Sequence, residues 1–191
     1  SELHGLGFCF TAVSALPSRL SGPLRQPRVG LYESWVPTAE EGWARWVFEE
    51  YETPYTTIVD NDIRGGHLNE AFDVIVLPHQ PPGQILQGNS IKDYPAQYSG
   101  GIGERGSGNL RAFVENGGTV VAWDGAAEFA LESLQLPVTN ALNGIPSTEF
   151  YAPGTFFRVL LDTEHPVAYG MPHRISVMFE RSPAFEPNAG T

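Results

Sequence analysis

A nearly continuous apolar run, Phe72-Asp73-Val74-Ile75-Val76-Leu77-Pro78, stands out in the first half of the chain. An apolar run of this length without polar alternation is typical of a strand buried on both faces of a parallel sheet. Shorter runs of the same kind lie at residues 28–32, 56–59 and 119–123. The pattern therefore predicts four strands, with residues 72–78 as the third.

Helical patterns separate these strands. Aromatic residues follow the first strand at helical spacing, and we expect most of them to pack on the sheet; they are Trp43, Trp46, Phe48 and Tyr51. A helix over residues 107–115 stops at Asn116-Gly117-Gly118, and another is expected over residues 126–134. The alternation predicts an α/β domain with a flavodoxin-like, doubly wound parallel sheet and helices on both faces. Further short strands are expected at residues 156–161 and 175–179.

Composition fits one globular domain. The chain has 191 residues, 41% of them hydrophobic and 17% charged, which predicts one domain over residues 28–191 behind a tail or interdomain linker at 1–27. Eleven basic against 22 acidic residues give a formal charge of −11, which opposes binding to nucleic acid or anionic lipid. No apolar stretch reaches the roughly 20 residues that span a bilayer. A single cysteine, Cys9, excludes an internal disulfide and a multi-cysteine metal cluster.

In parallel sheets of this kind, sites form beyond the carboxyl ends of the strands. That rule selects three loops, at residues 33–35, 79–80 and 124–125. Asp124 and His79 are the candidate catalytic residues, because an Asp-His pair can act as a general acid and base or hold a ligand. Asp124 also suits the cap of the helix that follows it, and the two roles are compatible.

Other acidic and aromatic residues are candidates for lining the same crevice. Such a lining fits a small polar ligand or a sugar ring. The candidate ligand-binding residues are Glu33, Trp35, Glu128, Glu149 and Tyr151.

Three short motifs favour structural roles. Residues 101–106 spell the glycine pattern of a dinucleotide fingerprint, but no strand directly precedes them, so no cofactor is expected. His67 and Glu70 have the spacing of zinc ligands, with His173 as a nominal third, but they lie in a polar approach without a rigid shell, so no metal is expected. Ser107 lacks the preceding strand of a nucleophile elbow and suits a helix N-cap.

Several motifs together resemble one known family of domains. They are Arg28-Val29-Gly30-Leu31-Tyr32, Glu41-Gly42-Trp43, Phe72-Asp73-Val74-Ile75-Val76-Leu77-Pro78, Gly117-Gly118-Thr119-Val120-Val121-Ala122, Glu128-Phe129 and His165-Pro166-Val167-Ala168-Tyr169-Gly170. Over residues 26–186 the chain resembles the domain that follows the peptidase in large bacterial zinc carboxypeptidases of the carboxypeptidase A type. That domain is similar to the class I glutamine amidotransferase fold.

The resemblance implies a neighbouring peptidase domain as partner and a periplasmic or secreted location. The amidotransferase family places a nucleophilic cysteine on the turn after a strand, because a thiolate needs a base and an oriented imidazole. In this chain the corresponding turn is Trp123-Asp124-Gly125, and Cys9 lies in the tail. Amide hydrolysis by the family's mechanism is therefore not expected.

Three hypotheses follow. The first is a non-catalytic accessory or binding domain of a zinc carboxypeptidase-type protein. The second is a small hydrolase of esters, amides or glycosides that uses Asp124, His79 or a serine in the crevice. The third is a homo-oligomerisation module that pairs through apolar surface.

Overall fold

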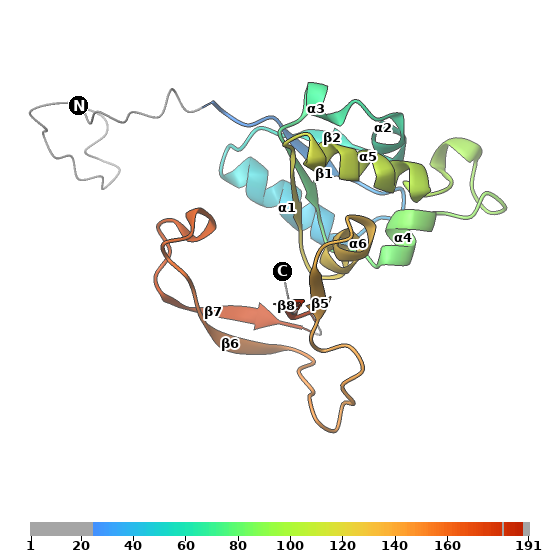
Figure 1. The fold of residues 1–191 in the computed structure, drawn as a ribbon. Helices are drawn as coiled ribbons and strands as arrows, with labels where there is room; N and C mark the ends of the chain where they lie inside the picture. Colours follow the sequence, from blue (N-terminus) through green and yellow to red (C-terminus); the bar gives the residue numbers. More distant parts are fainter. Residues whose placement is uncertain (1–24, 181, 189–191) are drawn as a thin grey trace, which may run out of the picture.

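The computed structural model describes residues 25–180 and 182–188. At its centre lies a sheet of four parallel strands (Figure 1). The strands are β1 (Val29–Tyr32), β2 (Thr56–Ile58), β3 (Val74–Leu77) and β4 (Thr119–Ala122). Their order across the sheet is β2-β1-β3-β4, which matches flavodoxin-like folds up to the fourth strand. The predicted α/β fold with a flavodoxin-like parallel sheet is confirmed.

Helices follow the strands in the expected alternation. They are α1 (Ala39–Glu50), α2 (Asp60–Gly65), α3 (Leu68–Ala71), α4 (Pro82–Gln87), α5 (Gly103–Glu115) and α6 (Gly125–Ser133), with 3-10 turns η2 (Ala96–Tyr98) and η3 (Pro166–Ala168). Within the described residues, no helix is long and apolar enough to cross a bilayer.

The two faces of the sheet are covered unequally. On one face, helices α2 to α6 build a core in which Phe113 and Phe129 pack with Ile75 of β3. The opposite face carries α1, whose Ala44 packs with Val76 of the same strand. Adjacent residues of β3 point to opposite faces because side chains alternate along a strand. We call the first side the covered face and the second the open face.

The prediction that the aromatic residues of α1 pack mostly on the sheet is wrong. Trp43, Trp46 and Tyr51 are 65%, 53% and 75% exposed, whereas Phe48 is half-buried. Among the described helices, α1 alone contributes a buried residue to the core on the open face. One flank of the helix therefore stays in solvent.

Helix α5 begins earlier than predicted. Its first residue is Gly103, and Ser107 lies inside the first turns, where its hydroxyl donates to the Gly103 carbonyl at 3.1 Å. The predicted N-cap role of Ser107 is therefore wrong. Just before the helix, a side chain at Gly101 would collide with the carbonyl oxygen of Ile85 in α4. Close packing of α4 against this segment explains a glycine there.

The C-terminal part forms two small antiparallel sheets beside the main one. Strand β5 (Val138–Asn140) pairs with β8 (Phe185–Pro187). Strand β6 (Thr155–Leu160) pairs with β7 (Arg174–Phe179), which confirms the two strands predicted there. Figure 1 shows this hairpin as an arm that extends away from the central sheet.

Candidate functional site

The carboxyl ends of β1, β3 and β4 lie at one edge of the sheet, because all four strands are parallel. The loop after β3 brings His79 to this edge, and the turn between β4 and α6 brings Asp124. Their side chains meet: His79 Nδ1 lies 2.8 Å from Asp124 Oδ2, and each side chain is 32% exposed. The structure therefore places the two predicted catalytic residues side by side.

Asp124 occupies a strained turn. It alone separates Trp123 from the first residue of α6, and its φ of 53° with ψ of −127° is a conformation that favours glycine. A sharp, strained turn from a strand into a helix is also the kind of backbone that holds the nucleophile in α/β-hydrolases. The Asp124 side chain makes no capping hydrogen bond to the helix. The predicted capping role is therefore wrong, and the carboxylate is directed to His79.

The next residue, Gly125, shows how tightly this elbow packs. A Cβ at this position would lie 2.9 Å from the Gln80 carbonyl oxygen and 3.2 Å from the His79 ring. Its N–H lies 3.1 Å from His79 Nδ1 and can donate to that atom when the nitrogen carries no proton. Asp124 Oδ2 lies 2.8 Å from the same Nδ1 as an ion-pair contact, so acceptance from the Gly125 N–H and donation to Asp124 belong to different protonation states of the His79 ring. Nε2 can accept a proton only in the tautomer that protonates Nδ1.

The loop after β1 is held by a buried polar pair. The hydroxyl of Tyr32 donates to Asp60 Oδ1 at 2.6 Å, and Asp60 is fully buried at the start of α2. Burial raises the pKa of Asp60, while the Tyr32 hydrogen bond opposes the rise. Burial, together with the Asp60 charge, also raises the pKa of Tyr32. Nearby, the Gln80 side chain donates to the Val36 carbonyl at 2.9 Å. These contacts fix the loop rather than present groups to solvent.

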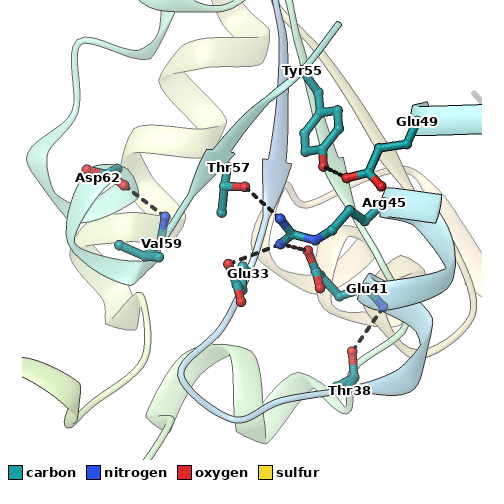
Figure 2. A network of polar contacts seen from close by, with 9 residues as sticks. All are labelled: Glu33, Thr38, Glu41, Arg45, Glu49, Tyr55, Thr57, Val59 and Asp62. Atoms are coloured by element: carbon teal, nitrogen blue, oxygen red, sulfur yellow. Dashed lines mark hydrogen bonds and ion pairs between the residues drawn. The ribbon is translucent and has the colours of Figure 1, made fainter. Parts of the chain in front are cut away.

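Glu33 is engaged in an ionic network at the same edge (Figure 2). Arg45 of α1 lies 3.2 Å from Glu33 and also pairs with Glu41, one helical turn before it. The spacing of Glu41 and Arg45 is a sequence signal that would have revealed this network. Because Arg45 neutralises it, Glu33 contributes less negative charge to the crevice than its sequence position suggests.

The pocket at this edge is small. It encloses about 40 Å³ and is lined in part by Tyr32, Glu33, Thr38, His79 and Gln80. That volume suits a water molecule, whereas sites for small organic ligands enclose roughly 300–1,000 Å³. Among the described residues, this pocket that His79 lines is therefore too small for a sugar ring.

The predicted ligand-binding residues do not share one crevice. Trp35 is half-buried and packs edge-on against Tyr98 with ring centroids 4.8 Å apart. Its indole N–H is buried without a hydrogen-bond partner. Glu149 is exposed and lines neither the pocket beside His79 nor the hollow around Glu128.

Glu128 and Tyr151 line a second, larger hollow of about 350 Å³ near the C-terminal strands. Glu128 accepts a hydrogen bond from the Asn140 amide at 2.8 Å, and Phe150 and Phe179 add aromatic surface. Asn140 was missed because the short strand β5 has no clear sequence pattern. We call this site the C-terminal hollow. It combines the acidic and aromatic groups predicted for a polar ligand.

The residues with zinc-like spacing do not converge. His67 Nδ1 lies 3.0 Å from Glu70 Oε1, but both side chains are about four-fifths exposed. His173 lies beside β7, where its Nδ1 is 2.8 Å from the Leu161 carbonyl oxygen. In the described part of the chain, no three His, Cys, Asp or Glu residues gather as a metal site. Cys9 lies outside the described residues.

Comparison with known proteins adds little to this geometry. No protein-family model matches the chain, and no curated protein matches it. Among solved structures, a ThuA-like protein from Bacteroides uniformis matches with a TM-score of 0.43 and 14% sequence identity. The match covers 90% of this chain and 64% of that structure, so this chain spans less than two thirds of its length. The fold assignment therefore rests on strand order, and the carboxypeptidase connection stays a prediction from motifs.

Proposed function

We propose that this domain is a non-catalytic accessory domain with the shape of an amidotransferase. The observation that carries the proposal is the elbow, where Asp124 stands in the nucleophile's position and pairs with His79 at 2.8 Å. A carboxylate paired with an imidazole is a poor attacking group, and the pocket of about 40 Å³ that His79 lines is smaller than sites for organic substrates. In this proposal the strained turn keeps its structural role, and its residue is the carboxylate Asp124 rather than the family's nucleophilic cysteine.

The motif set that resembles carboxypeptidase-associated domains supports a neighbouring zinc carboxypeptidase domain as the partner. In that role the domain binds, positions or stabilises the peptidase. The C-terminal hollow supports a second element of the proposal, which is binding of a small polar or sugar ligand by Glu128 and Tyr151. An aromatic ring beside a carboxylate suits the apolar face and the hydroxyl groups of a sugar.

The test is turnover. Wild-type protein is assayed against a panel of ester, amide and glycoside substrates, beside the variants Asp124→Asn and His79→Gln. The accessory proposal expects wild type and both variants to remain at the rate of the buffer blank. Turnover that either substitution abolishes would overturn it.

A small hydrolase is the second candidate, and the His79–Asp124 geometry favours it. In the tautomer that carries the proton on Nδ1, Asp124 would orient the His79 ring and leave Nε2 available as a general base for a water molecule. The pocket beside His79 has room for that water. This candidate expects Asp124→Asn to lower the rate constant more than substrate affinity, because the carboxylate orients the base without touching the substrate.

A further inference from the structure

A large apolar groove lies on the open face, between α1 and strand β4. It encloses about 660 Å³, and apart from Glu40 every lining residue is apolar. The floor comes from β3 and β4, and the wall from α1. The central lining residues are Trp43, Ala44, Val47, Val76, Val121 and Trp123.

The groove exposes side chains that the fold ordinarily buries. Parallel sheets are usually covered on both faces, because every side chain of a central strand is then in the core. Along β4, Val120 packs against the core of the covered face, whereas Val121 is 43% exposed on the other side. A continuous apolar patch of this kind marks an interaction surface.

The described chain starts beside this groove. Its first residue is Arg25, and Pro27 is part of the groove lining. Residues 1–24 are therefore attached at the groove's rim. They contain the apolar stretch Leu6-Gly7-Phe8-Cys9-Phe10-Thr11-Ala12-Val13-Ser14-Ala15-Leu16.

The connection is long enough for this stretch to enter the groove. Eight residues, 17–24, separate Leu16 from Arg25, and an extended chain of that length spans up to about 28 Å. The groove crosses from β1 to β4, two inter-strand spacings or about 10 Å. A segment tethered at the rim also has an effective local concentration in the millimolar range.

Charge favours this segment over a second copy of the chain. Residues 1–24 contain one acidic residue, Glu2, and one basic residue, Arg19, so the formal charge of −11 belongs to the remainder. Two copies that met through their open faces would bring two strongly negative bodies together, which is unfavourable. The uncharged stretch at 6–16 adds no charge beside Glu40.

We propose that residues 6–16 dock in the groove and complete the core of the open face. The tail is then an integral part of the domain rather than a linker. Its apolar side chains cover Trp43, Val121 and Trp123, and Cys9 is buried with them.

The experiment uses Cys9, the single cysteine of the chain, as a natural reporter. The rate at which a thiol reagent modifies Cys9 is measured in the native full-length protein and in the same chain unfolded in urea. We expect modification at least about tenfold slower in the native protein, because buried thiols react only on local opening. Native reactivity equal to that of the unfolded chain would overturn the proposal.

Val121→Asp places a charge in the groove and is expected to release Cys9, raising its modification rate toward the unfolded value. The matched control is Val167→Asp, since Val167 is 88% exposed in η3, away from the groove. The control is expected to react like wild type. Equal effects of the two substitutions would contradict docking.

A second readout covers the case in which Val121→Asp does not fold. The double substitution Phe8→Asp and Phe10→Asp in the full chain is expected to shift tryptophan emission to the red, because Trp43 and Trp123 become solvated. Ser18→Asp with Ser21→Asp adds the same charge outside the apolar stretch and is expected to leave emission unchanged. No shift in the first variant would overturn the proposal.

Cys9 protection and light scattering are finally measured over a range of protein concentrations. Docking within the chain expects protection that is independent of concentration in a monomer. Protection that appears only as dimers form would assign the groove to a second copy and overturn the proposal.

Discussion

The two faces of the central sheet are built from the same strands but reach different degrees of completion. On the covered face, side chains of β1, β3 and β4 pack against α2 to α6. Phe113 and Phe129 are almost fully buried there. On the open face, α1 buries Ala44 and leaves Trp43 and Trp46 in solvent. The difference shows that the apolar pattern of the strands is sufficient to form the sheet. Whether a face of the sheet is buried depends on helices and segments from other parts of the chain.

The largest expected effect contrasts one aromatic residue from each face. Phe113→Ala on the covered face should lower the free energy of unfolding by about 3–5 kcal/mol, because it leaves a cavity among packed helices. Trp46→Ala, whose side chain is 53% exposed and lies outside the groove lining, should cost about 1 kcal/mol or less. Urea denaturation of both variants measures the difference. Equal losses of unfolding free energy in the two variants would contradict the difference in packing between the two faces.

A second prediction concerns the polar pair within the covered face. Tyr32→Phe removes the hydroxyl that donates to buried Asp60, and should cost about 1–3 kcal/mol near pH 7 because the carboxylate loses a partner. Burial raises the pKa of Asp60 above its usual 3.8. The stabilisation from proton uptake is therefore complete below about pH 3.8 and is lost as pH rises through the folded-state pKa.

The cost of Tyr32→Phe should accordingly be smaller at acidic pH, where Asp60 binds a proton and needs no donor. Urea denaturation at several pH values, with wild type beside the variant, provides the measurement. A cost that stays constant with pH would indicate that the tyrosine contributes packing alone.

A third prediction concerns the turn at the end of β4, where a substitution should increase the free energy of unfolding, by less than the decreases expected above. Asp124→Gly should raise the free energy of unfolding by about 1 kcal/mol, because glycine adopts positive φ without strain and the partly exposed pair with His79 contributes little. Gln135→Gly is a control with the same φ of 53° outside the site. Thermal unfolding of both variants measures the shift. A destabilised Asp124→Gly would show that the pair outweighs the strain.

The smallest effect on stability is expected at the amino ends of the strands, where the ion pair of Arg28 and Asp73 is exposed. Arg28 pairs with Asp73 at 2.8 Å and lowers the pKa of that carboxyl to about 2. Stability from this pair is present above the usual pKa near 3.8 and is lost as pH falls toward 2. Asp73→Asn should therefore lower the melting temperature slightly at neutral pH, and the difference from wild type should vanish as pH falls toward 2, so the acid side of a plot of melting temperature against pH is flatter in the variant. An unaltered acid limb would rule out this pair as its cause.

The position of His79 and Asp124 could be predicted from the sequence, because the order of parallel strands determines where the loops after them lie. Once the strands are recognised, the loops at residues 79–80 and 124–125 must lie at one edge, since parallel neighbours share their carboxyl ends. The 2.8 Å contact between His79 and Asp124 follows that logic. The proposed crevice did not extend to Glu128 and Tyr151, because those residues belong to a hollow formed with β5 and Phe179 that is visible only in three dimensions.

The sequence by itself determined the alternation of strands and helices, since apolar periodicity and glycine stops are local signals that each segment carries alone. Tertiary structure decided which apolar residues are covered. Trp43 has the helical spacing of a core residue yet is 65% exposed beside the described elements, because burial depends on a neighbour that local periodicity does not specify. It also decided that Asp124 turns to His79 rather than capping α6, since that choice depends on a backbone angle and on a side chain 45 residues away.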